Sequence, residues 1–226
     1  MRTILFFAAD IWMITIGFIY GVKFIRRHHN YLLGLEWIIM GVSGTNFLIY
    51  AITKASVSYH ILWFLDAFSR SIGFTLIVVL GLLVVTHGYR PSIRVEVGAF
   101  ALAAVFGFVL SVFAEQIGIP GKVFMMTTCL ATCGFLLYFA RRLWAIGQRT
   151  HAAWVVGDTA VVVYVIAVFD FFGGIPGDDA DRTLFWTLAL SSWGLMMLIL
   201  YRAYTAFAAH NIRVGAGVDR ATASTV

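Results

Sequence analysis

Apolar residues along this chain fall in long runs that short polar stretches separate. Runs of about 18 or more such residues match the ~20-residue helix that crosses a ~30 Å hydrocarbon core. Reading each run against its polar flanks predicts seven membrane-spanning helices. These are Thr3–Val22, Leu32–Thr53, Ile61–His87, Val97–Ile117, Val123–Leu143, Ala153–Phe172 and Thr183–Ala206. The expected fold class is all-α, an integral membrane bundle of seven transmembrane helices.

The polar stretches between the runs are short, which predicts one transmembrane domain over residues 1–209 with no extramembrane domain. The first run follows a basic residue, as in a signal peptide, but it contains Asp10 and has no small-residue cleavage site before Lys23. We therefore interpret it as the first span. Residues 210–226 turn polar and are expected to form a disordered tail.

Charge is unevenly distributed between the connectors. The first, third and fifth connectors contain KFIRRHH, HGYRPSIR and RRLWAIGQRTH, whereas the sixth reads GGIPGDDADR. Because basic residues concentrate on the cytoplasmic side, the odd connectors and the C-terminus are expected in the cytoplasm and the N-terminus outside. An odd number of spans places the two termini on opposite sides of the membrane, which agrees with this arrangement. The predicted location is the cell membrane, as a multi-pass protein.

Composition supports the same class. The 226 residues are 61% hydrophobic and only 12% charged, and the mean hydropathy is +0.90, which excludes a soluble domain with a polar surface. The lipid bilayer is thus the first expected partner. The net charge of +5 is explained by cytoplasmic loops, so no nucleic-acid partner is expected.

No cofactor or metal site is evident from the sequence. Cys129 and Cys133 lie one helical turn apart, a geometry that disfavours a disulfide, and we interpret them as packing residues without further metal ligands nearby. The histidines lie at span ends, which argues against haem bound within the membrane. A microbial rhodopsin is similar in length and span count, but its pigment needs a lysine in the last span, and LFWTLALSSWGLMMLILYRAY has none.

The third predicted span contains two charged residues, Asp66 and Arg70. At positions i and i+4 they share one helix face, so an ion pair is geometrically easy. A lone arginine near the membrane midplane costs at least ~2.5–3.5 kcal/mol, so it needs a partner or a watery cavity. The pair either joins helices structurally or belongs to a functional site.

Other polar residues fall at a similar depth in the predicted outer half. The expected substrate-binding residues are Asp66, Arg70, Asp10, Asn46, Tyr50, Asp170 and Ser191. Glu36 and Asp158 lie nearer the cytoplasmic face. This distribution predicts a cavity that opens outward or is occluded below the outer surface. No catalytic residue is identified.

Length and topology also resemble those of the small seven-span membrane-bound terpene cyclases. TNFLIY, Thr45–Tyr50, resembles their second-span region, although Tyr50 stands where those enzymes have a glutamate. The resemblance implies an enzyme that protonates an isoprenoid or lipid, with Asp66, Asp170 or Asp10 as the general acid.

Three functional hypotheses follow. The favoured hypothesis is a transporter or carrier of a polar or anionic small molecule. Under this hypothesis the protein is not an enzyme. The second is the membrane-embedded enzyme described above. The third is an accessory subunit whose polar groups only join helices. Assembly as a homo-oligomer or with a partner membrane subunit is left open.

Overall fold

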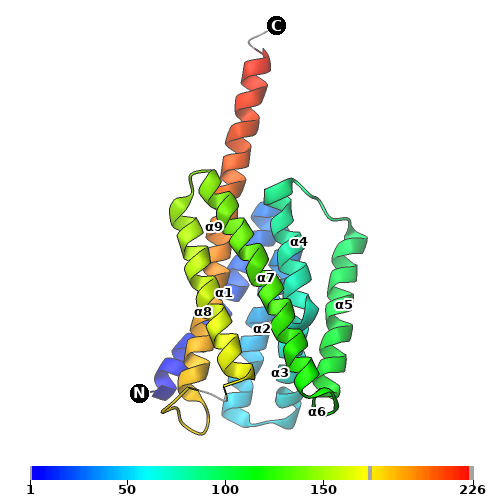
Figure 1. Cartoon of the computed structure of the whole chain (residues 1–226), viewed down its shortest axis with the longest axis vertical. Coiled ribbons are helices and arrows are strands. Elements are labelled where there is room, and N and C mark those ends of the chain that lie inside the picture. Colours follow the sequence, from blue (N-terminus) through cyan, green and yellow to red (C-terminus); the bar gives the residue numbers. More distant parts are fainter. Residues whose placement is uncertain (1, 173–174, 224–226) are drawn as a thin grey trace.

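The computed structural model describes residues 2–172 and 175–223, and nearly all of them are helical (Figure 1). The elements are α1 (Arg2–His28), α2 (Tyr31–Thr53), α3 (Ser56–Phe68), the π-helical turn η1 (Ser69–Gly73), α4 (Phe74–His87), α5 (Ile93–Val112), α6 (Ala114–Ile117), α7 (Ile119–Ala145), α8 (Arg149–Asp170) and α9 (Thr183–Ala223). No strand occurs in the described ranges. The predicted all-α class is therefore confirmed.

Seven helical segments are long and apolar enough to cross a membrane, as the hydrophobic runs predicted. The third segment is continuous from Ser56 to His87 and combines α3, η1 and α4. Several boundaries differ from the prediction, and two of these differences have a local cause. The first helix continues from Val22 to His28, because the basic residues in its last turn favour a helix C-terminus. The fourth ends at Val112 instead of Ile117, because the backbone at Phe113 leaves helical geometry.

The two ends of the chain lie at opposite ends of the bundle, and α9 projects beyond the other helices (Figure 1). α9 continues to Ala223, into the segment predicted to form a polar tail. At the start of this segment, Asn211 donates a hydrogen bond of 2.8 Å to the carbonyl oxygen of Val85 at the end of α4. Residues 224–226 of the predicted tail lie outside the described residues.

Close packing of α1 against α2 depends on glycine. A Cβ atom at Gly17 would lie 2.8 Å from the carbonyl oxygen of Trp37, and one at Gly21 would lie 2.8 Å from the carbonyl oxygen of Gly34. Both distances are too short for a real side chain, so the two backbones approach because these positions have none. Gly17 and Gly21 are the two glycines of the GFIYG segment, whose GxxxG spacing places both on one face of α1.

The third long segment changes from α-helical to π-helical geometry near its middle, at η1, which includes Arg70. Here the backbone N–H of Phe74 donates to the carbonyl oxygen of Ser69, five residues earlier, which defines a π-helical turn. A Cβ at Gly73 would lie 3.2 Å from the Cβ of Ala103 on α5. Thr128 on α7 donates a hydrogen bond of 3.0 Å to the carbonyl oxygen of Arg70. The turn is thus held by contacts with α5 and α7.

Candidate functional site

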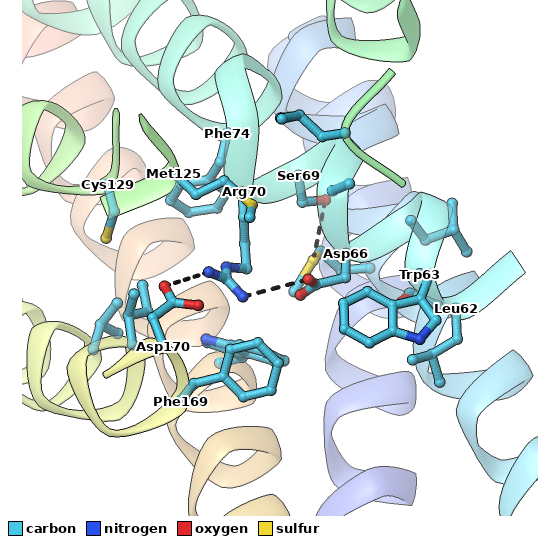
Figure 2. A pocket seen from close by; sticks show the side chains of 18 of the residues that line it. Leu62, Trp63, Asp66, Ser69, Arg70, Phe74, Met125, Cys129, Phe169 and Asp170 are labelled. Carbon is cyan, nitrogen blue, oxygen red and sulfur yellow. Dashed lines mark hydrogen bonds and ion pairs between the residues drawn. The ribbon is translucent and has the colours of Figure 1, made fainter. Parts of the chain in front are cut away.

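Arg70 lies between two carboxylates from different helices (Figure 2). Its Nη1 atom is 3.4 Å from Oδ2 of Asp66, and its Nη2 atom is 2.5 Å from Oδ2 of Asp170. The side chains of Arg70 and Asp170 are 9% and 3% exposed, whereas that of Asp66 is 19% exposed. We call these three residues the charged triad. It supplies the charge compensation that a buried arginine requires.

Phe169 and Lys122 complete the surroundings of the triad. The guanidinium carbon of Arg70 lies 4.7 Å from the centre of the Phe169 ring, within range of a cation–π interaction. Asp170 is the last residue of α8, where a carboxylate is unfavourable next to the negative end of the helix dipole. Arg70 offsets this repulsion, and Lys122 Nζ lies 3.5 Å from the Asp170 carbonyl oxygen.

The triad forms part of the wall of a cavity with a volume of about 550 Å³. Cavities of roughly 300–1,000 Å³ bind small molecules in other proteins. Gly118 and Arg182, which precede α7 and α9, contribute to the lining together with mid-helix residues such as Met196. The cavity therefore extends from one end of the bundle toward its middle.

Most of the cavity lining is apolar or aromatic. The aromatic residues are Phe47, Tyr50, Tyr59, Trp63, Phe74, Phe169, Trp186 and Trp193. The acidic and basic residues in the lining are Asp66, Arg70, Lys122, Asp170 and Arg182. The triad itself has two acids and one base, so its formal charge is −1, and Lys122 and Arg182 bring the formal charge of the whole lining to +1. The cavity suits a ligand with an apolar body and a small polar group.

The structure brings together four of the seven residues predicted to bind a substrate. Asp66, Arg70, Asp170 and Tyr50 line the cavity, whereas Asp10, Asn46 and Ser191 are outside its lining. Asn46 instead donates a hydrogen bond of 2.9 Å to the carbonyl oxygen of Ser58, which joins α2 to α3. Ser191 lies half-buried on α9.

Asp10 is fully buried on α1, and neither of its carboxylate oxygens has a hydrogen-bond partner among the described residues. A Cβ added at Gly44, which lines the cavity, would lie 3.0 Å from Oδ1 of Asp10. Asp10 is therefore directly behind the cavity wall. An isolated charged carboxylate in such a place is very costly.

Two further acids are buried among the helices. Glu36 on α2 accepts a hydrogen bond of 3.1 Å from the hydroxyl of Ser69 on η1, and its Oε2 atom has no partner in the described part of the chain. Asp158 on α8 also leaves one oxygen without a described partner. Ser69 and Arg70 are consecutive residues of η1, so the same turn contacts Glu36 and both triad acids.

Several cavity residues were not singled out as ligand-binding by the sequence reasoning. Trp186 and Trp193 are typical packing residues, and Lys122 stands at a predicted span end, but all three line the cavity. Their positions become informative only when α7, α8 and α9 are placed together. In the described ranges, no group of three or more His, Cys, Asp or Glu side chains is arranged to hold a metal ion.

Comparison with protein-family models, with curated proteins and with solved structures found no match for this chain. The charged triad and its cavity are therefore the features of the molecule that bear on its function.

Proposed function

We propose that this chain is a multi-pass protein of the cell membrane, with the N-terminus outside and the C-terminus in the cytoplasm. The distribution of charge along the helices supports this orientation. At the C-terminal end of the bundle, the helix ends and connectors contain the basic residues Arg26, Arg90, Arg142 and Arg149. At the opposite end, the connector before α9 contains Asp178 and its acidic neighbours (Figure 1). This is the asymmetry expected from the positive-inside rule.

In this orientation the protein is a carrier for an amphipathic small molecule. The observation that supports the proposal most directly is a mainly apolar cavity of about 550 Å³, with several aromatic side chains in its lining and the charged triad in its wall. The aromatic side chains contact the apolar body of the solute, and the triad binds its polar group. The cavity begins at the proposed outer end, so the solute enters from outside the cell.

The triad favours a solute that donates hydrogen bonds. Arg70 alone would attract an anion, but it is already bound by two carboxylates. Each carboxylate uses Oδ2 for Arg70, which leaves Oδ1 as an acceptor for a group such as an amine. We therefore propose a polar, amine-bearing solute in place of a simple anion.

The membrane-enzyme hypothesis has weaker support. The aromatic lining would suit a lipid or isoprenoid substrate, but acid catalysis needs a carboxylic acid that holds a proton and reaches the substrate. The two acids in the cavity wall, Asp66 and Asp170, both form ion pairs with Arg70, so a substrate would have to compete with Arg70 for them. Asp10 is outside the lining. The carrier is thus the better account of the geometry.

Uptake of ethidium into proteoliposomes that enclose DNA tests the carrier proposal, because ethidium has an aromatic body, amino groups and fluorescence that rises on DNA. We expect the natural chain to accelerate uptake relative to empty vesicles. Asp66→Asn should reduce this uptake about tenfold or more, since a hydrogen bond to a charged group contributes about 1.5–3 kcal/mol. The variant retains the shorter Arg70–Asp170 pair and should stay folded.

Glu115→Gln is the matched control, because Glu115 is an exposed acid at the same end of the bundle but outside the cavity lining. It should leave uptake unchanged. Equal uptake by Asp66→Asn and the natural chain would contradict the proposed role of the triad.

A further inference from the structure

Two thiols lie side by side in the cavity wall on α7. Cys129 and Cys133 are one helical turn apart, both are free, and their Sγ atoms are separated by 4.0 Å. Both residues line the cavity. Figure 2 shows Cys129 and Met125 near the pair of Arg70 and Asp170. The arrangement goes beyond the packing role expected from the sequence, because the thiols face a space that a ligand can enter.

The spacing of the two sulfurs suits a single bridging ion. Two metal–sulfur bonds of about 2.3 Å place their sulfur atoms up to about 4.6 Å apart when the ion is two-coordinate. The observed 4.0 Å therefore requires only small rotations of the two side chains. A disulfide would instead require a sulfur–sulfur bond of about 2.05 Å, which adjacent turns of a helix do not readily allow.

Thioether groups surround the same space. Met125 lies one turn before Cys129, so the pattern M-x3-C-x3-C places three sulfur atoms along one face of α7. Met13, Met40 and Met196 from α1, α2 and α9 also line the cavity. Thiolate and thioether ligands together are selective for Cu(I) over the harder divalent metals.

Few oxygen ligands, which harder metal ions prefer, lie near the two thiols, and the nearby hydroxyl groups already form hydrogen bonds. The hydroxyl of Thr128 donates to the carbonyl oxygen of Arg70, and the hydroxyl of Thr132 donates to Thr75 at 2.9 Å. No group of three or more His, Cys, Asp or Glu side chains is available within the described ranges. This disfavours the closed four-ligand sites typical of zinc and leaves a site for an ion that accepts two thiolates.

We propose that Cys129 and Cys133 bind one Cu(I) ion, with the thioether of Met125 as an additional ligand. Binding replaces the two thiol protons: one Cu(I) ion and two S–H groups give a dithiolate complex and two released protons, with no change in oxidation state. The complex carries one negative charge. This proposal does not depend on the carrier function.

The test uses the purified, reduced full-length chain in detergent without oxygen. Cu(I) is supplied as its coloured complex with bathocuproine disulfonate, and withdrawal of the ion is followed by loss of that colour. We expect one Cu(I) per chain and release of two protons per ion in weak buffer. Because the chain has only two cysteines, every thiol-dependent signal comes from this pair.

Cys129→Ser and Cys133→Ser should each weaken Cu(I) binding by more than about tenfold, since a bridge needs both sulfurs. Met125→Leu should weaken it less, and Met126→Leu, on the same helix but outside the lining, should leave it unchanged. Circular dichroism shows whether each variant is folded. Unchanged binding in the double cysteine variant would show an adventitious ion only and overturn the proposal, as would the absence of Cu(I) transfer to the natural chain.

Discussion

At the scale of single residues, Arg70 is the centre of the charged triad. It is almost fully buried, and its charge is balanced within the same cluster by Asp66 and Asp170. Removing one acid leaves Arg70 with the other acid as its partner in the triad, so the cost depends on which of the two ion pairs is lost. The two carboxylates should therefore differ in importance according to their burial and distance from Arg70.

We predict that Asp170→Ala destabilises the protein more than Asp66→Ala. Asp170 is 3% exposed and 2.5 Å from Arg70, so its loss should cost about 3–5 kcal/mol. Asp66 is more exposed and more distant at 3.4 Å, and its loss should cost about 1–2 kcal/mol. Denaturant unfolding in a fixed detergent measures both changes. Equal losses of stability would contradict this ranking.

At the scale of helices, the contact between α1 and α2 depends on positions without side chains. We predict that Gly17→Ala lowers the free energy of unfolding by about 1–3 kcal/mol, because its Cβ would meet the carbonyl oxygen of Trp37 at 2.8 Å and force the helices apart. Gly134→Ala on α7 is the matched control, since nothing lies within 4 Å of the added Cβ. It should be neutral or slightly stabilising. Equal destabilisation in both variants would contradict the packing argument.

The start of α9 is stabilised by a carboxylate in the connector before it. The carboxylate of Asp178 accepts hydrogen bonds from the backbone N–H groups of Leu184 and Phe185, at 2.9 and 2.8 Å. Slight burial acts to raise the pKa of Asp178, but these backbone donors outweigh it and lower the pKa below its usual value of 3.8. The ionised carboxylate is therefore the form that favours the folded state.

A pH dependence follows from this lowered pKa. The contribution of Asp178 should be complete above about pH 4 and should disappear as the pH falls through the folded-state pKa. Asp178→Asn should therefore reduce thermal stability at neutral pH, and its difference from the natural chain should shrink at the lowest pH. Asp181→Asn, at an exposed position of the same connector, is the control. A difference that is constant with pH would contradict the role of the charge.

At the scale of the whole molecule, the proposed orientation can be tested with single cysteines in a Cys129→Ser/Cys133→Ser background. We predict that a cysteine replacing Asp179, before α9, reacts with a membrane-impermeant maleimide on intact cells. A cysteine replacing Arg90, in the connector between α4 and α5 at the other end, should react only after permeabilisation. Labelling with the opposite preference would reverse the orientation and direct the cavity toward the cytoplasm.

The number of long helices was predictable because each is a run of apolar residues, and this property requires no knowledge of the neighbouring helices. The pairing of Asp66 with Arg70 was also predictable from the sequence, because positions i and i+4 lie on the same face of one helix. The close approach of α1 and α2 also followed from the local spacing of Gly17 and Gly21. Local periodicity and hydropathy thus determine the elements of this protein and their shortest-range contacts.

Contacts between distant segments were decided only by tertiary packing. Asp170 is 100 residues from Arg70, and no local pattern identifies it as the closer partner. The π-helical turn at Arg70 depends on Thr128 from α7, and the half-buried Asn46 contacts a backbone carbonyl instead of the cavity. A polar side chain on a helix can face a cavity, a neighbouring backbone or a closed interior. Which of these it meets depends on how the helix is rotated about its axis and on how deep the residue lies in the bundle. The cavity therefore exists only in the assembled bundle.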